Sequence, residues 1–227
     1  MLRSEPTIPT QSTGIVLFSI VIAAMLLFPG CRKTVTENYS SGKLKAEMLY
    51  KGKKLDGISV WWYENGTKQQ EITYKAGLVD GKLTRWYASG TKSLEEIYSR
   101  GKRNGKSSAW DELGNISEEK NYAGDTLHGP YKMWYPTGMV RIQGAYSSGL
   151  FQGRWEYFDE TGVKVGVGNF EKGSGKQQAY NRNGKITREV TYKANRKDGP
   201  ETWYAADGKP IKEVTWKADK FVSEKQF

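Results

Sequence analysis

The chain has 227 residues, and its 35 Lys and Arg outnumber 25 Asp and Glu, which gives a formal net charge of +10. It contains one Cys and one His, so an intramolecular disulfide, a cysteine-rich metal site and most multi-histidine metal sites are excluded. The 26 Gly, the 13% aromatic content and the mean hydropathy of −0.70 fit a soluble, turn-rich β protein.

An apolar run over residues 15–28 lies near the N-terminus and is interrupted only by Ser19. Spanning a bilayer takes about 20 apolar residues, so this run is short for a permanent anchor and is typical of a signal-peptide core. Gly30 and Cys31 follow it closely, and Cys31 is the only cysteine. This arrangement resembles a bacterial lipoprotein signal, in which Gly30 precedes the cleavage point and Cys31 is acylated.

The alternative interpretation is an uncleaved signal anchor with an incidental cysteine. Both interpretations predict that residues 32–227 are exported. We therefore predict a signal peptide over 1–30, a tether over 31–38 and one further domain over 39–227. By resemblance to lipoproteins, the protein would sit in the bacterial cell envelope. Arg32 after the cysteine favours the outer membrane over the inner one.

Internal repetition with a period of 24 residues dominates the rest of the chain. Two glycine registers and two aromatic registers share this period, and all four share one two-residue deletion between Gly162 and Gly175. The first glycine register is Gly42, Gly66, Gly90, Gly114, Gly138, Gly162, Gly184 and Gly208. The second is Gly57, Gly81, Gly105, Gly129, Gly153, Gly175 and Gly199. Such a period indicates a repeat architecture, in which each unit packs on its neighbours.

Each unit contains two short strands, the first as in residues 44–50 and the second as in residues 57–62. Tight-turn sequences such as Glu64-Asn65-Gly66 join one unit's second strand to the next unit, and a longer connection is expected within each unit. We therefore predict an all-β fold, an elongated repeat array of antiparallel β-hairpins with about 15 strands. The eighth unit is expected to end after one strand, and the deletion in the sixth puts the continuity of the sheet in question there.

The clearest copy of the unit is Tyr63-Glu64-Asn65-Gly66 with Asp80-Gly81 and Trp86-Tyr87. This pattern resembles the MORN repeat, and in particular the bacterial MORN-variant group often labelled YwqK-type antitoxins, over residues 39–220. The resemblance implies an elongated antiparallel sheet and a role in binding or scaffolding. A fold resemblance does not by itself establish an activity.

Three side-chain registers follow the same period. The first ring register is Tyr50, Tyr74, Tyr98, Tyr122, Tyr146, Phe170, Tyr192 and Trp216, and the second is Trp62, Trp86, Trp110, Trp134, Phe158, Tyr180 and Tyr204. Both are expected to form stacked ladders along the array. Three residues before the first ring, six of eight positions are Glu, and cross-strand Lys or Arg partners are expected beside them. A periodic carboxylate row argues against an active site, which needs a unique constellation.

Rings that break the period are the candidate partner-binding residues, and they are expected on a face that the core does not use. They are Trp61, Tyr131, Trp155, Tyr157 and Trp203. His128 occupies the Asp/Asn turn register before Gly129, so it is interpreted as a turn residue rather than a general base.

These features favour a non-catalytic protein-interaction or scaffold module with an unidentified protein partner. No catalytic residue, no cofactor, no metal and no nucleic acid is expected. The alternatives are a binder of anionic lipid or envelope glycan, since Lys and Arg are spread over all units, and an antitoxin-like neutralising protein. A glycan hydrolase would need two opposed carboxylates, and the turn acids that could supply them are Asp111, Glu112, Asp159, Glu160 and Asp207.

Overall fold

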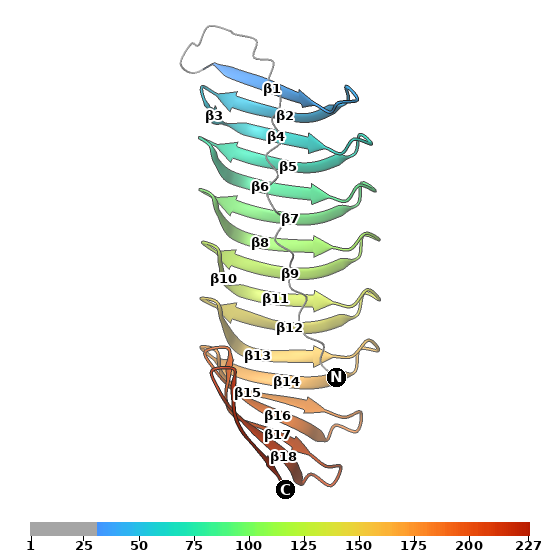
Figure 1. The fold of residues 1–227 in the computed structure, drawn as a ribbon, viewed down its shortest axis with the longest axis vertical. Coiled ribbons are helices and arrows are strands. Elements are labelled where there is room, and N and C mark those ends of the chain that lie inside the picture. Colours follow the sequence, from blue (N-terminus) through green and yellow to red (C-terminus); the bar gives the residue numbers. More distant parts are fainter. Residues whose placement is uncertain (1–30) are drawn as a thin grey trace.

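The computed structural model describes residues 31–227 as one open antiparallel β-sheet, and Figure 1 shows it as a long ribbon of strands stacked in chain order. The predicted all-β array of antiparallel hairpins is therefore confirmed. The predicted signal peptide, residues 1–30, lies outside the described residues. The strands are β1 (Arg32–Asn38), β2 (Leu44–Lys51), β3 (Lys54–Leu55), β4 (Gly57–Trp62), β5 (Lys68–Lys75), β6 (Leu78–Trp86), β7 (Lys92–Ser99), β8 (Lys102–Trp110), β9 (Ile116–Ala123), β10 (Thr126–Leu127), β11 (Gly129–Trp134), β12 (Val140–Ser147), β13 (Leu150–Phe158), β14 (Lys164–Glu171), β15 (Ser174–Tyr180), β16 (Ile186–Lys193), β17 (Arg196–Tyr204), β18 (Pro210–Lys217) and β19 (Lys220–Gln226).

The sheet has 19 strands instead of about 15, for three reasons. Bulges split two second strands into β3 and β4 and into β10 and β11. The eighth unit is complete, because β18 and β19 pair as a hairpin. The third reason is an additional strand in the segment 31–38, where the predicted tether is wrong. Residues Arg32–Asn38 form β1, which pairs along its length with β2, since its alternating Thr and Val residues suit an edge strand.

One long edge of the ribbon, named here the five-residue edge, carries turns of identical geometry. At residues 63–67, the N–H of Tyr63 donates to the carbonyl of Thr67 (2.8 Å) and the N–H of Gly66 donates back to Tyr63 (2.9 Å). Gly66 has a φ of 90°, which a residue with a Cβ adopts only at a cost. The first glycine register thus marks every turn of this edge, as predicted. The turns are 39–43, 63–67, 87–91, 111–115, 135–139, 159–163, 181–185 and 205–209.

The opposite long edge, named here the two-residue edge, is tighter than expected. Within each unit the strands are joined by two residues, as at Ala76 and Gly77, whose φ values of 52° and 89° are typical of a type I′ turn. The expected longer connection is wrong because the strands extend up to the turn and absorb the additional residues as a bulge. In the β5–β6 hairpin the pairing shifts between Ile72 and Tyr74.

The shortened sixth unit remains a continuous part of the sheet. Strands β14 and β15 pair without any register shift, so the deletion removes the bulge that the regular hairpins carry. Asn195, on the two-residue edge of the seventh unit, occupies the freed space. Its Oδ1 accepts a hydrogen bond from the N–H of Phe151 (2.8 Å), and its Nδ2 donates to the carbonyl of Gly149 (2.8 Å). A Cβ on Gly173 would lie 2.6 Å from this Oδ1, so glycine leaves room for the bridge.

We predict that Asn195→Gly lowers the free energy of unfolding by about 1–2 kcal/mol, because two backbone groups lose their hydrogen-bond partner. Glycine keeps the φ of 66° accessible, so the change isolates the side-chain bonds. Urea unfolding measures the effect. The matched control is Asn183→Gly on an exposed turn, expected to cost a few tenths of a kcal/mol. Equal losses for both variants would contradict the bridging role.

Candidate interaction surface

One face of the sheet, named here the carboxylate face, carries the predicted glutamate register. The Glu side chains do not adjoin each other, because second-strand hydroxyl residues lie directly between them: Glu71 pairs with Thr84, and Thr84 pairs with Glu95. The same order continues through Ser108 to Glu119. Alternation of acids with small hydroxyl groups keeps like charges two strands apart, about 10 Å.

The expected basic partners of this register are present at several positions. Lys82 Nζ lies 2.7 Å and Lys92 Nζ 2.8 Å from Glu95, and Lys176 lies 2.7 Å from Glu189. Although burial opposes ionisation of Glu95, hydrogen bonds from Lys82 and Lys92 hold its pKa below the ordinary value. Glu71, Glu95, Glu119 and Glu189 are thus paired with lysines and remain partly exposed to solvent, as expected for this register.

All five candidate rings lie on the other face, named here the aromatic face, and they share it with the first ring register. Residues opposite each other in an antiparallel pair point to the same side, and so do residues two apart on a strand. Trp61 pairs with Ala46, which lies four residues before Tyr50 on β2. Trp203 pairs with Arg188, four residues before Tyr192 on β16. The expectation that these rings use a separate face is therefore wrong.

Trp155 is buried at the centre of a ring cluster instead of being displayed. It is 3% exposed, its Nε1 donates to the carbonyl of Ala145 (3.1 Å), and it stacks on Tyr131 at 5.6 Å between ring centroids. Tyr146 meets it edge-on at 5.0 Å. A Cβ on Gly144 would lie 2.2 Å from the indole, so only glycine fits under this ring.

The structure brings the candidate rings Tyr131, Trp155 and Tyr157 together. Trp61 and Trp203 lie apart from them. Tyr157 lies two residues after Trp155 on β13 and pairs with Ile142, next to the ring cluster. Burial is the main cause that raises the pKa of the phenols of Tyr131 and Tyr157. Trp61 lies far along the ribbon on β4, and Trp203 lies on β17 with Arg188 and Lys212 over its ring at 5.4 and 5.5 Å.

The expected stacked ladders do not form in most of the array. Rings of one register lie two strands apart, about 10 Å, which exceeds the 4.5–7 Å of an aromatic pair. The one pair within the first register that comes into contact among residues 31–227 is Phe170 and Tyr192, at 5.7 Å. Instead, rings of the second register lie under lysines, as Trp86 does under Lys68 at 5.5 Å and Trp110 under Lys92 at 5.1 Å.

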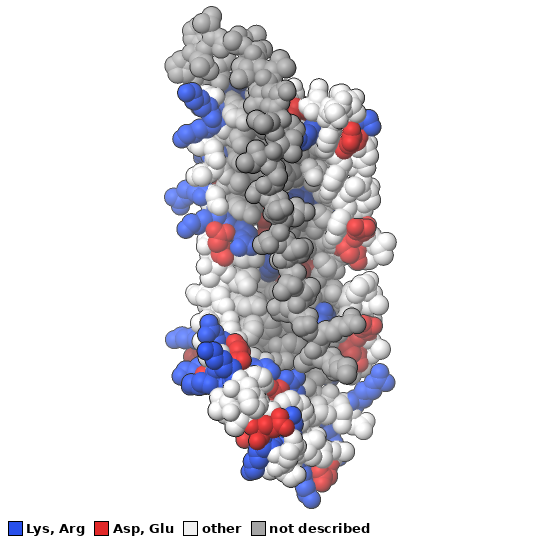
Figure 2. All heavy atoms as spheres, in the orientation of Figure 1, with Lys and Arg blue, Asp and Glu red and all other residues white. Residues whose placement is uncertain are grey.

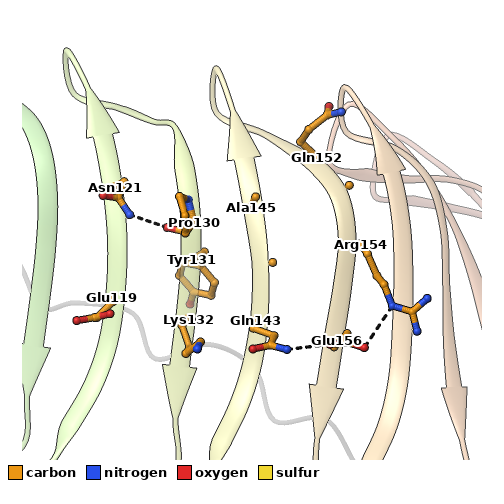
Figure 3. Close-up of a pocket in the computed structure, with 12 residues that line it drawn as sticks. Glu119, Asn121, Pro130, Tyr131, Lys132, Gln143, Ala145, Gln152, Arg154 and Glu156 are labelled. Carbon is orange, nitrogen blue, oxygen red and sulfur yellow. Dashed lines mark hydrogen bonds and ion pairs between the residues drawn. The ribbon is translucent and has the colours of Figure 1, made fainter.

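A shallow groove of about 610 Å³ interrupts the carboxylate face over β9 and β11–β13 (Figure 3). Its floor contains Ala145, where the equivalent positions of the first three repeats hold the larger Leu49, Thr73 and Ile97. The row across it is altered too: Glu119 pairs with Lys132, and Lys132 pairs with Gln143. The groove therefore mixes charges of both signs, an amide and small side chains.

Glu156 closes one side of the groove and is the most strongly held acid on this face. It accepts hydrogen bonds from Lys164 Nζ (2.6 Å), Gln143 Nε2 (2.8 Å) and Arg154 Nε (3.2 Å), the last two of which are visible in Figure 3. Together these donors, with Lys164 first, lower the pKa of Glu156 to about 2. The carboxylate serves as a fixed acceptor at neutral pH.

Basic side chains gather on the two-residue edge, although the sequence spreads them over all units. Figure 2 shows them along the side where the β2–β3, β5–β6 and β7–β8 connections lie. The exposed members in the first three units are Lys51, Lys53, Lys54, Lys75, Arg100 and Lys102. A hollow of about 420 Å³ on this edge is lined by Ser99, Arg100, Lys102, Asn104 and Gly124.

Of the five turn acids that a hydrolase could use, Asp111, Asp159 and Asp207 serve as turn caps, and Glu112 and Glu160 are exposed. Asp159 Oδ1 accepts hydrogen bonds from the hydroxyl and the N–H of Thr161 and from the N–H of Val163. The Thr161 hydroxyl is the main cause that holds the pKa of Asp159 below its ordinary value. Asp111 caps its own turn in the same way through Leu113 and Asn115. Asp207 accepts from the N–H of Lys209, again within its turn.

His128 keeps its predicted place in a turn register and also links two repeats. Its N–H donates to the carbonyl of Asn121 (2.9 Å), and its Nδ1 accepts from the N–H of Ser148 (3.3 Å). Gln152 Oε1 likewise accepts a hydrogen bond from the N–H of Lys172 in the next unit.

A tyrosine register that the sequence analysis missed joins neighbouring repeats along the five-residue edge. The hydroxyl of Tyr63 donates to the carbonyl of Trp86 (2.9 Å), and that of Tyr87 donates to Trp110 (2.8 Å). Tyr39 and Tyr135 make the same bond. Their 24-residue spacing is visible in the sequence and was the available signal.

A buried carboxylate on the aromatic face of the last repeats was missed too. Glu201 is 1% exposed, pairs with Arg188 and accepts from Lys197 Nζ at 2.9 Å. Burial opposes its ionisation, but Lys197 and Arg188 keep its pKa lowered. No sequence signal distinguished it from surface acids, because its burial depends on strand register.

Residues 31–227 contain no group of three or more His, Cys, Asp or Glu side chains placed to hold a metal ion. The same part of the chain has no helix that is long and apolar enough to cross a membrane.

The lowered pKa of Glu156 predicts a specific acid sensitivity. A carboxyl group with a depressed folded-state pKa stabilises the fold above its unfolded pKa, about 4.3, and the stabilisation is lost as pH falls towards about 2. We expect wild type and Glu156→Gln to differ in stability at pH 7 and to converge towards pH 2. Urea unfolding between pH 7 and pH 2 measures this, and a pH-independent difference would contradict the assignment.

Comparisons with known proteins bear on the repeats. The family model described as MORN repeat variant matches residues 33–51, 55–76, 127–147, 174–194 and 197–218. No curated protein matches the chain. Among solved structures, the one titled "Crystal Structure of TcdB2-TccC3" is similar at 12% identity and a TM-score of 0.18, over 80% of this chain and 14% of that chain. The chain is thus an array of β-hairpin repeats, and five of its segments match the MORN repeat variant.

Proposed function

We propose that this chain is a non-catalytic protein-interaction or scaffold module, held at the bacterial cell envelope by a lipid on Cys31. The observation that carries the proposal is where the repeat pattern breaks. On an otherwise regular ribbon, the groove and the ring cluster both lie between β9 and β16. Extended repeat surfaces are suited to binding other proteins, and departures from the period are where a specific contact can be encoded.

The position of Cys31 supports the anchoring part of the proposal. The residue is exposed and directly precedes β1, the strand at the end of the ribbon. Because β1 is part of the sheet, an acyl group on Cys31 would leave almost no slack between membrane and ribbon. Stable attachment needs more than one acyl chain, as bacterial lipoproteins provide. The signal peptide over 1–30 and an outer-membrane location belong to this proposal.

A second candidate function rests on the basic two-residue edge. Its exposed Lys and Arg side chains and the hollow at Arg100, Lys102 and Asn104 would suit an anionic lipid headgroup or an acidic envelope glycan. Neutralising a toxin, as the YwqK-type label suggests, would be one form of the first function, since it is binding to a protein partner.

The anchoring proposal predicts that cells incorporate a labelled fatty acid into the wild-type protein and not into Cys31→Ser. The reason is that Cys31 is the only thiol in the chain. The measurement is metabolic labelling followed by membrane fractionation. A matched control, Ser40→Ala on the first turn of the ribbon, should label like wild type. Label retained by Cys31→Ser would contradict lipidation at this residue.

The interaction proposal predicts crosslinks to a protein partner from the central repeats. A photoreactive amino acid would replace Tyr131, Tyr157, Trp61 or Trp203 singly, and Lys54 on the basic edge would be the comparison site. Discrete protein adducts from Tyr131 or Tyr157, absent from Lys54, are expected. No protein adduct at any site, together with binding to a polyanion that weakens as salt rises, would favour the second candidate function.

A further inference from the structure

An apolar strip lies on the five-residue edge in three consecutive turns of the middle repeats. Its members are Leu113, 86% exposed, Met139, 48% exposed, and Val163, 44% exposed. Regular turns hold polar residues at the same positions. The equivalents of Leu113 are Ser41, Asn65, Ser89, Thr137, Thr161, Asn183 and Asp207. The equivalents of Met139 and Val163 are Lys43, Thr67, Thr91, Asn115, Lys185 and Lys209.

A hollow beside the first member of the strip could accommodate a side chain of a bound partner. It measures about 230 Å³ and is lined by Thr91, Lys92, Trp110 and Gly114. Gly114 adjoins Leu113 in the same turn, so the hollow and the most exposed apolar side chain are neighbours. The second and third members adjoin each other, because Met139 Sδ would lie 3.8 Å from a Cβ on Gly162, which precedes Val163 in the next turn. Clustered exposed apolar groups of this kind mark interaction sites.

The turns that hold the first and third members of the strip carry exposed acids, in a chain whose net charge is positive. Glu112 and Glu160 are exposed in the turns that hold Leu113 and Val163, and neither forms an ion pair within residues 31–227. Figure 2 shows acidic side chains on this edge at the β8–β9 and β13–β14 turns. The nearby cations have their own contacts: Lys92 pairs with Glu95 and Lys164 with Glu156. The Arg141 guanidinium lies over the Tyr135 ring at 5.6 Å, and Arg182 of the next turn acts on Asp159, whose pKa it helps to lower. Charge complementarity therefore selects a basic partner.

The spacing of the turns restricts the partner's conformation. Successive turns of this edge are two strands apart, about 10 Å. In an α-helix, residues seven apart lie about 10.5 Å apart on one side, which matches this spacing. In a β-strand, residues three apart span a similar distance but point to opposite sides, so a strand cannot contact the row.

We propose that this strip docks a basic amphipathic α-helix of a partner protein, with heptad-spaced apolar residues on Leu113, Met139 and Val163 and Lys or Arg beside Glu112 and Glu160. The inference rests on the proposed interaction function and names the chemistry of the partner. The helix would dock on the five-residue edge, whereas the candidate binding rings lie on the aromatic face. The docking proposal and the proposed interaction function can therefore fail separately.

The test uses a defined probe, a synthetic peptide of three heptads with Leu at every seventh position and Lys on both flanks. A peptide of the same composition with a scrambled order is its control. Fluorescence anisotropy measures binding of each peptide to residues 31–227 in the full chain. We expect the heptad peptide to bind at least tenfold more tightly than the scrambled one. Equal binding of both peptides would overturn the proposal, because charge alone would then explain the contact.

Two sets of variants locate the site. Leu113→Ser, Met139→Thr and Val163→Thr together restore residues that regular turns contain, so the fold is preserved, and they should weaken peptide binding at least tenfold. Glu112→Lys with Glu160→Lys should weaken it at least fivefold. Glu64→Lys changes the same turn position in an early repeat and should leave binding within twofold of wild type. Unchanged binding in the triple variant would overturn the proposal, whereas partner crosslinks from Tyr131 would still leave the general function standing.

Discussion

Backbone hydrogen bonding between neighbouring hairpins is the interaction on which this structure depends. In residues 31–227 the antiparallel pairing of neighbouring strands is continuous from β1 to β19. Only eight hydrophobic side chains in this part of the chain are buried, so apolar burial contributes less than in a layered domain. The edges therefore carry much of the cohesion between repeats, through Tyr63-type hydroxyl bonds on one side and turn-to-turn bonds such as that of Gly77 to Leu55 on the other.

The loss of two residues in the sixth repeat shows how local geometry propagates in such a ribbon. Regular hairpins carry a bulge near the second glycine, and bulges increase local twist. Strands β14 and β15 lack one, and Figure 1 shows the strands from β15 onward turned relative to those before them. The same loss brings Phe170 to within 5.7 Å of Tyr192 and lets Asn195 reach Phe151. The ring contact, the bridge and the change of direction thus all lie at or next to the shortened repeat.

Much of this fold could be predicted from the sequence because glycine positions encode turns directly. Gly66 and its equivalents need positive φ, and every one of them ends a hairpin. The faces were harder to assign, since each bulge shifts the alternation of side chains by an amount that the sequence does not state. Trp61 and Trp155 were expected on a separate face because they lie outside the two ring registers, and the period alone does not say to which side they point. The gathering of Lys53, Lys75 and Arg100 on one edge was predictable, because alternate connections of an antiparallel array always lie on the same side. The contact of Asn195 with Phe151 spans 44 residues and had no local signal.

In a periodic protein, regularity itself separates scaffold from site. The glutamate row recurs in six of eight repeats, and four of its members make the same kind of pair with lysine. A feature that recurs in this way cannot single out one position for a partner. The middle repeats differ on three surfaces at once: Ala145 opens a groove, Trp155 fills the opposite face over Gly144, and Leu113, Met139 and Val163 break the polar turns. Exposed apolar turn residues gain nothing for the sheet, since they leave water-contacting hydrocarbon on an edge that serine or threonine would solvate. Their presence in three successive turns is most simply explained by a surface that covers them, and the unpaired Glu112 and Glu160 beside them define its charge.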